Sequence, residues 1–240
     1  MFIDYETFRQ RAGHLLQLMH QACIAAGRDP ATVHLLPVTK THPPEAAAYA
    51  VRFGLTAVGE NRVQEAVDKK AKISAPLRWE LIGHLQTNKA MLAATHFDRV
   101  QSVDSEKLLR QLDRGAGELG RKLPILLQIN AGGDPAKFGV DLVEAPRLLE
   151  SALSCTDLQV DGLMTIAPLG STPDETAEHA RRTFGNLRTL RDELAVRFGA
   201  PLTELSMGMT GDFVPAIAAG STLVRVGTAL YGTRDLPPPT

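Results

Sequence analysis

Lys40 is the residue whose setting first suggests chemistry. It follows a short apolar run, residues 33–39 (VHLLPVT), and the residues after it, THPP at 41–44, are typical of the end of a strand. The run has no polar face on which a lysine would normally lie, so the amine either extends into solvent or reacts in a sheltered pocket. An amine beside apolar walls and other cations shifts towards its neutral, nucleophilic form. Lys40 is therefore a candidate nucleophile, with a solvated lysine as the alternative.

Two turns of small residues near the end of the chain could bind a phosphate group. The first is SMGMTGD at 206–212, where hydroxyls and uncovered backbone amides precede a predicted helix. The second is RVGT at 225–228, which adds further amides and the Thr228 hydroxyl. Ordinary turns are the alternative, and a single glycine turn would be a weak signal, but the pair favours a phosphate site.

A neutral lysine that faces a phosphate site suggests a Schiff base, either with a phosphorylated carbonyl substrate or with pyridoxal phosphate. Arg225 lies two residues before Gly227 and could direct its guanidinium at a ring nitrogen. Such an arginine would keep a pyridine nitrogen unprotonated and weaken the ring as an electron sink. A surface salt bridge is the alternative role for Arg225, but the strand around it, TLVRVG, is otherwise apolar.

Alternating strands and helices must position these residues. Eight short, β-rich runs are predicted as strands at 33–39, 56–59, 78–83, 99–103, 125–130, 160–166, 203–208 and 222–227. Helix-like stretches lie between them at 44–53, 62–72, 87–95, 105–117, 141–154, 173–198 and 211–219. A further helix is predicted over residues 1–27, with Asp4 placed to cap its start and Gly27 to end it.

This alternation predicts an α/β fold, a (β/α)8 TIM barrel with an additional N-terminal helix. Strands separated by helices are parallel and joined by crossovers, and eight such units in roughly 200 residues are typical of a barrel. A doubly wound open sheet is the alternative, but it usually has a glycine-rich turn after its first strand, where this chain has Lys-Thr-His-Pro-Pro. We expect a single domain over residues 1–240, with a tail at 235–240. As the last residue of the first strand, Lys40 would lie on the active face, where barrels often bind phosphate after strands 7 and 8.

The composition excludes several classes of protein. The chain has 240 residues, 44% of them apolar and 22% charged, which is enough for a full core. Its formal net charge of −1 offers no basic field for nucleic acid or for a membrane surface, and no apolar run approaches a membrane span. The N-terminus lacks a signal-peptide pattern, so we expect a cytoplasmic protein. Cys23 and Cys155 are expected to be buried, reduced thiols rather than a disulfide or redox pair, and no metal-type spacing occurs.

Seven segments together resemble the pyridoxal phosphate homeostasis proteins, a family related to the N-terminal barrel of alanine racemase. They are LLPVTKT at 35–41, VGENRVQE at 58–65, WELIGHLQTNK at 79–89, QSVDS at 101–105, GLMTI at 162–166, LSMGMTGD at 205–212 and AIAAGSTLVRVGTALYG at 216–232. Their order and spacing cover nearly the whole chain, although no single segment would identify the family. Thr39 replaces a frequent serine, and Thr210-Gly211 replaces a frequent Ser-Asp, without removing a group that the chemistry needs.

The resemblance implies pyridoxal 5′-phosphate (PLP), the vitamin B6 cofactor, held as a Schiff base on Lys40. It further implies phosphate contacts from Ser206 and the 227–228 turn, and Arg225 near the pyridine nitrogen. The cofactor-binding residues predicted in this way are Lys40, Asn61, Met164, Ser206, Gly208, Met209, Thr210, Arg225, Gly227 and Thr228, with His84 and Asn88 as further candidates for the pocket. Lys137 matches a possible second acceptor of the cofactor, and a solvated loop lysine is the alternative.

The function expected from the resemblance is PLP homeostasis, in which the chain holds the cofactor and supplies it to apo-enzymes. Alanine racemase has a second domain that supplies a tyrosine acid/base. This chain ends after its eighth strand, and its tyrosines (Tyr5, Tyr49 and Tyr231) are not on strand-end loops. We therefore expect no catalytic residue and no efficient racemisation. We also expect a monomer. A weak PLP-dependent racemase or decarboxylase-like enzyme is an alternative. A Schiff-base aldolase is another, although its lysine is normally on a later strand.

Overall fold

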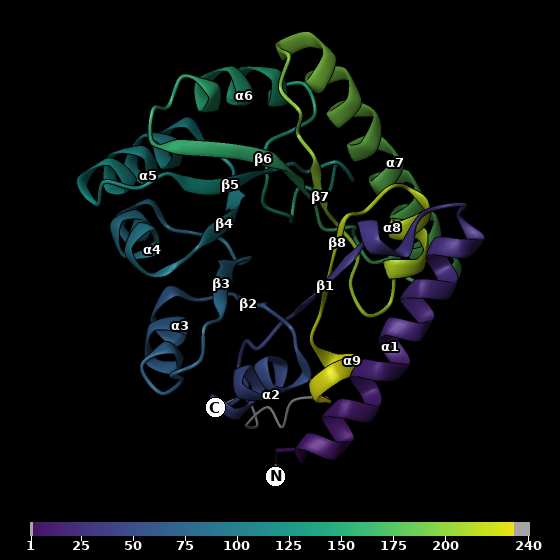
Figure 1. The fold of residues 1–240 in the computed structure, drawn as a ribbon. Coiled ribbons are helices and arrows are strands. Elements are labelled where there is room, and N and C mark those ends of the chain that lie inside the picture. Colours follow the sequence, from purple (N-terminus) through teal and green to yellow (C-terminus); the bar gives the residue numbers. More distant parts are fainter. Residues whose placement is uncertain (1, 233–240) are drawn as a thin grey trace.

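Eight parallel strands form one curved sheet at the centre of the molecule (Figure 1). The structure is a computed structural model, and it describes residues 2–232. In chain order the strands are β1 (His34–Pro37), β2 (Ala57–Glu60), β3 (Arg78–Leu81), β4 (Arg99–Val103), β5 (Leu123–Gln128), β6 (Leu158–Met164), β7 (Glu204–Ser206) and β8 (Leu223–Val226). Their order in the sheet is β1-β8-β7-β6-β5-β4-β3-β2.

The sheet closes into a barrel between β1 and β2. Val38, just past β1, forms a parallel bridge with Gly59, and the Thr39 N–H donates to the Gly59 carbonyl at 3.0 Å. This closure confirms the predicted (β/α)8 barrel and excludes the doubly wound open sheet. Each predicted strand is present, with ends that differ by up to two residues.

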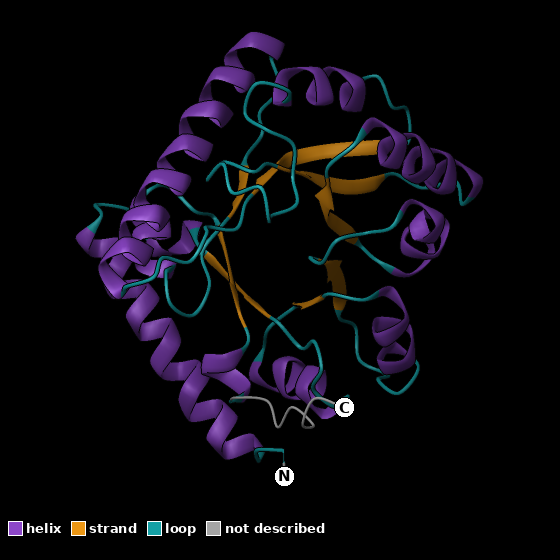
Figure 2. Cartoon of the chain, turned by 180° about the vertical axis from the view of Figure 1, so that it is seen from behind, coloured by secondary structure: helices purple, strands orange, loops and turns teal. Residues whose placement is uncertain are grey.

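Helices surround the strands (Figure 2). They are α1 (Tyr5–Ala25), α2 (Glu45–Phe53), α3 (Val63–Lys70), α4 (Ala90–His96), α5 (Glu106–Glu118), α6 (Ala145–Leu153), α7 (Pro173–Phe198), α8 (Phe213–Ala218) and α9 (Thr228–Tyr231), with short 3-10 turns η1 (Pro30–Thr32) and η2 (Thr87–Lys89). The short helix α9 and the turn η1 were not predicted. α6 begins four residues later than expected, with a proline in its first turn, a position that favours a helix start.

α1 forms because a stripe of apolar residues recurs along it and its first turn is capped. The Asp4 carboxylate accepts from the Thr7 N–H at 2.7 Å, and the buried stripe is Phe8, Ala12, Leu15, Met19 and Cys23. The helix ends at Ala25, and Gly27 follows in a left-handed conformation. The stripe packs against α8 and α9, so α1 covers the flank of the barrel near β8 and β1 (Figure 1).

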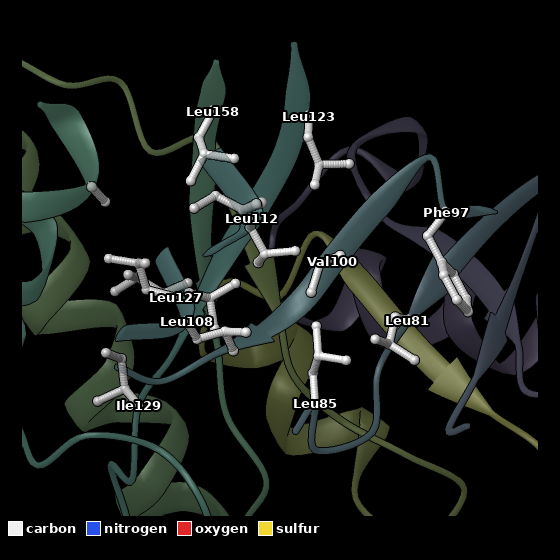
Figure 3. Packing of buried hydrophobic residues seen from close by; sticks show 14 of the residues in the cluster. Leu81, Leu85, Phe97, Val100, Leu108, Leu112, Leu123, Leu127, Ile129 and Leu158 are labelled. Carbon is white, nitrogen blue, oxygen red and sulfur yellow. The ribbon is translucent and has the colours of Figure 1, made fainter. Parts of the chain in front are cut away.

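The largest part of the core lies between the strands and the outer helices (Figure 3). α5 buries Leu108 and Leu112 in the same cluster as Leu123 and Leu127 of β5, and all four are almost completely buried. Fully burying one such side chain stabilises the fold by about 1.5–3 kcal/mol. By contrast, polar residues such as Gln101, Ser206 and Arg225 are buried on the strands themselves. The strands therefore carry buried polar and charged side chains, which a hydrophobic core would normally exclude.

Several smaller expectations concern single residues or the ends of the chain. Lys40 lies in a turn beyond β1 and is not its last residue, because β1 ends at Pro37. Both cysteines are free thiols; Cys23 is buried as predicted, but Cys155 is only half-buried, just after α6. No helix in residues 2–232 is both long and apolar enough to cross a membrane. The single domain over 1–240 stays a prediction, and the tail at 235–240 lies outside the described residues.

Candidate functional site

A cavity of about 310 Å³ opens beyond the C-terminal ends of the strands. Its walls come from β8 and from the segments that follow β1, β2, β3, β6, β7 and β8. The lining residues are Val38, Lys40, His42, Asn61, Ile82, Ile166, Met209, Thr210, Gly211, Arg225, Gly227 and Thr228. Seven of the ten predicted cofactor-binding residues therefore meet in one cavity: Lys40, Asn61, Met209, Thr210, Arg225, Gly227 and Thr228.

Lys40 enters the cavity from the turn after β1, where it is half-buried. The next residue, Thr41, has a left-handed backbone with φ of 62°, which is uncommon for a β-branched residue. Its N–H donates to the Glu65 carboxylate, and its hydroxyl donates to the Lys40 carbonyl at 2.6 Å. The lysine is thus presented by a tight turn whose conformation depends on side chains of the following β/α unit.

Two turns line the cavity with groups suited to an anion. In the turn after β7, Gly208 has φ of 94°, and a Cβ there would come within 2.6 Å of Ala216 Cβ, so only glycine fits. After β8, Gly227 caps α9, and the first N–H groups of a helix have no partner within the helix. Thr210 and Thr228 both line this cavity, so the two turns can offer several hydrogen-bond donors to one bound group.

Asp212 is the acidic residue of the first turn. The Met209 N–H donates to its carboxylate at 2.5 Å. Burial raises the pKa of Asp212, while the hydrogen bond from Met209 and the charge of Arg225 oppose the shift. The carboxylate therefore stabilises the turn through its hydrogen bond with the Met209 N–H, and it is partly shielded from solvent.

Arg225 supplies a buried cation to the cavity, and only 4% of the residue is exposed. Its guanidinium donates to the Ser206 hydroxyl at 2.7 Å and to the Thr165 carbonyl at 2.8 Å. These bonds use two of its five N–H donors. Burial lowers the pKa of Arg225 to about 10, with Asp212 opposing the shift, so the group is still positively charged at neutral pH.

A polar chain continues from Arg225 down the barrel interior. The Ser206 hydroxyl donates to Gln101 Oε1 at 2.6 Å, and Gln101 Nε2 donates to Glu80 Oε2 at 2.6 Å. Glu80 in turn pairs with Arg99 at 2.8 Å. Ser206 is completely buried in this chain and is not among the residues that line the cavity. Its predicted phosphate contact stays a prediction.

The other predicted residues are not among those that line the cavity. Met164 is buried on β6, and Gly208, also buried, directly precedes Met209, which does line the cavity. His84, beyond β3, is 3.5 Å from the Asp104 carboxylate and stacks on Phe138 with ring centroids 3.8 Å apart. Asn88 is in the turn η2. Lys137, the residue before Phe138, is half-buried in the loop after β5.

Sequence reasoning missed five lining residues: Val38, His42, Ile82, Ile166 and Gly211. His42 and Gly211 belong to segments that the sequence had marked as candidates (THPP and SMGMTGD), but the sequence did not show that these two residues face the cavity. Val38, Ile82 and Ile166 are apolar residues at or just beyond strand ends, where no pattern separates a cavity wall from a core. Together the lining combines apolar contacts, an amine, a buried cation and two donor-rich turns. It suits a flat ring compound that carries both a phosphate and an aldehyde.

Comparison with known proteins gives the same picture over almost the whole chain. The family model of the alanine racemase N-terminal domain matches residues 15–235. The pyridoxal phosphate homeostasis protein of Pseudomonas aeruginosa is 39% identical over 232 residues, which is 95% of this chain and 96% of that protein. The protein of the same name from Escherichia coli is 37% identical over 235 residues, 93% of this chain and 97% of that one.

Solved structures with the same fold include a protein that binds PLP. PipY of Synechococcus elongatus, solved with PLP bound, superposes with a TM-score of 0.80 at 39% identity, covering 94% of this chain and 100% of that one. Alanine racemase of Clostridium difficile superposes with a TM-score of 0.70 at 15% identity, covering 92% of this chain and 57% of that one. The second likeness concerns the fold alone, because its sequence identity is low.

Proposed function

Because this chain belongs to the family of the pyridoxal phosphate homeostasis proteins, we propose that it binds PLP and keeps it available to other proteins. The observation that carries the proposal is the meeting of Lys40, Arg225 and two donor-rich turns in one cavity. When bound, PLP supplies an aldehyde that condenses with a lysine amine to form a Schiff base, with release of water. Each part of the cofactor then has a matching group in the cavity.

We assign the covalent bond to the Lys40 amine and the phosphate to the two turns. Thr210 and Thr228 provide hydroxyls, and Met209 and Gly227 belong to the backbone that surrounds the same space. A phosphate carries a charge of about −1.5 to −2 and accepts several strong hydrogen bonds, so these donors hold it more firmly than any single side chain would.

The ring of the cofactor takes the remaining surfaces. Val38, Ile82 and Ile166 offer apolar contacts to its faces, and Asn61 offers an amide at the edge of the cavity. Arg225 is assigned to the pyridine nitrogen. Because its cation is fixed by Ser206 and by the Thr165 carbonyl, it disfavours a proton on that nitrogen. Ser206 and Met164 are assigned to the layer beneath the cofactor, where Ser206 acts through Arg225.

We propose that the chain holds and releases PLP without efficient catalysis. Tyr231 is buried and donates to the Ala46 carbonyl at 3.0 Å, and burial raises its pKa far above the ordinary value. Tyr49 donates to the Ile3 carbonyl at 3.3 Å, and the Tyr5 ring lies under Arg52. In residues 2–232, none of these tyrosines lines the cavity, so none is placed as the acid or base of a two-base proton transfer.

Proton exchange at the α-carbon of amino acids separates a carrier from an enzyme. The PLP-loaded protein is incubated with L- and D-amino acids in deuterated water, and deuterium incorporation is followed by NMR. A carrier leaves the α-proton in place over many hours, whereas turnover at ordinary enzymatic rates would support the weak racemase. Transfer is measured in parallel: addition of the loaded protein should restore activity to an apo-enzyme that requires PLP, and a Lys40→Ala variant should not.

Four further properties belong to the proposal. We place the chain in the cytoplasm, which is supported by its free thiols Cys23 and Cys155, since reducing compartments keep thiols unpaired. We propose a single domain, since one closed barrel accounts for the described strands. We also propose that apo-enzymes which require PLP are transient partners of the chain. We propose a monomer. Light scattering coupled to size exclusion tests that state, and a mass of twice 25.9 kDa at working concentration would contradict it.

A further inference from the structure

Both peptide groups that flank Lys40 are held by charged side chains of the next β/α unit. On one side, Lys69 Nζ of α3 donates to the Thr39 carbonyl at 2.6 Å. On the other side, the Thr41 N–H donates to the Glu65 carboxylate of the same helix. The two contacts fix the backbone immediately before and immediately after Lys40, the lysine that we assign to the cofactor.

Lys69 is the centre of this arrangement. Its ammonium pairs with Glu60 and with Glu65, each at 2.7 Å, and the residue is only 5% exposed. Glu60 is completely buried and also accepts from the Thr39 hydroxyl at 2.6 Å. Burial raises the pKa of Glu60, while Lys69 opposes that shift. A buried ion pair is weak evidence for a purely stabilising role, because desolvation offsets most of its Coulombic gain.

The backbone between the two contacts is strained. Thr41 has a left-handed φ of 62°, and a β-branched residue adopts this conformation only where its surroundings enforce it. The Glu65 contact to the Thr41 N–H reaches this turn from α3, and we assign to it the role of holding the conformation. Without it, the turn can relax to an ordinary conformation. Such a change rotates the peptide that follows Lys40 and moves the amine away from its present direction.

We propose that Lys69, Glu60 and Glu65 form a clamp that positions Lys40 for its reaction with the cofactor aldehyde. The inference rests on the proposed function, in which Lys40 Nζ bonds to the aldehyde carbon and the carbonyl oxygen leaves as water. The clamp touches neither the phosphate turns nor Arg225. It therefore governs how readily the covalent bond forms, and it leaves noncovalent binding of the phosphate and ring unchanged.

Two disrupting variants, one matched control and one conservative variant test the clamp. Lys69→Met removes the ammonium with little change of volume, and Glu65→Ala removes the acceptor of the Thr41 N–H from a more exposed site. Lys70→Met is the control, because Lys70 is on the same helix but donates to the His96 carbonyl at 2.9 Å. Glu65→Gln keeps an acceptor oxygen and should restore most of the wild-type behaviour. Circular dichroism establishes that each variant is folded.

Three measurements separate positioning from general damage. The rate at which the visible Schiff-base band appears after PLP is added should fall about 10- to 100-fold in both clamp variants, the range expected for a small misplacement of a reacting group. Affinity for pyridoxamine 5′-phosphate, which has no aldehyde, should stay at the wild-type value. In the protein without cofactor, the Thr41 amide should exchange its hydrogen faster in Glu65→Ala than in Lys70→Met.

Each outcome decides the inference. If Lys69→Met and Glu65→Ala form the band as fast as wild type, the clamp has no positioning role. If they lose pyridoxamine 5′-phosphate affinity in the same proportion, their role is structural and the inference is wrong. If Lys69→Met does not fold, Glu65→Ala decides alone. If the wild-type protein itself forms no band and binds no analogue, the proposed function fails first and the clamp with it.

Discussion

Removing the phosphate from the ligand should weaken binding far more than removing the Arg225 guanidinium. The phosphate perturbation is made on the ligand, by comparing pyridoxamine 5′-phosphate with pyridoxamine on the wild-type protein. The two turns line the cavity with Thr210 and Thr228, which we assign to the phosphate together with backbone N–H groups of the same turns. If two charge-assisted hydrogen bonds survive as net gain, at about 1.5–3 kcal/mol each, the loss is about 3–6 kcal/mol. That range corresponds to about 10²- to 10⁴-fold in Kd.

The Arg225 perturbation is smaller because the ring nitrogen offers a single acceptor. One hydrogen bond of this kind contributes about 0.5–1.5 kcal/mol net, so Arg225→Ala should weaken pyridoxamine 5′-phosphate binding by roughly tenfold or less. The variant also leaves the Ser206 hydroxyl and the Thr165 carbonyl without the guanidinium, which lowers stability. Its folding is therefore verified by thermal unfolding before binding is measured.

Equilibrium dialysis of both ligands against both proteins gives the two losses on one scale. The expected order is a large loss for the missing phosphate and a small one for the missing guanidinium. Both ligands lack the aldehyde, so covalent bonding to Lys40 does not enter the comparison. Equal losses, or a larger loss in Arg225→Ala, would refute the assignment of the phosphate to the two turns.

Three further predictions concern stability. Gln101→Leu breaks the polar chain and takes one hydrogen-bond partner each from Ser206 and Glu80. At about 1–3 kcal/mol for each group, urea unfolding should show a loss of about 2–6 kcal/mol. A loss below about 1 kcal/mol would mean that the chain is not coupled. Leu112→Ala should lower the unfolding free energy by about 2–5 kcal/mol, and an unchanged midpoint would contradict the packing of α5 on the barrel. Asp212→Asn tests a pH dependence. Burial raises the pKa of Asp212 in the folded state above its ordinary 3.8, so the native state holds this proton more tightly than the unfolded state does. Wild-type stability therefore falls as the pH rises from the unfolded pKa to the folded one. The variant should gain stability over wild type between pH 4 and neutral pH, with no difference in more acid solution, whereas a constant difference would refute this reasoning.

Features with a local signature were predictable from the sequence. Strand and helix alternation led to the barrel because apolar periodicity and turn residues are local, and Asp4 and Gly208 lie where a cap and a glycine turn require them. Lys40 was found because it interrupts that pattern at a strand end. Even there, the final position differed: the tight turn at Thr41 places the lysine beyond β1 instead of within it.

Features that depend on pairing across the barrel were not predictable. The hydroxyl of Ser206 donates to Gln101, which is 105 residues away in sequence, and no local pattern indicated this partner. Likewise, nothing local in the sequence indicates that Lys69 of α3 meets the Thr39 carbonyl. Long-range partners of polar residues follow from the register of the closed sheet, which short-range patterns do not contain.

Chemical reduction of the PLP-loaded protein tests the central claim most directly. Borohydride converts a Schiff base to a stable amine, and peptide mass spectrometry then locates the cofactor on the chain. We predict modification of the peptide that contains Lys40, together with a yellow protein whose visible band is absent in Lys40→Ala. A cofactor found on Lys137 instead, or a colourless protein that cannot be loaded with PLP, would contradict the account.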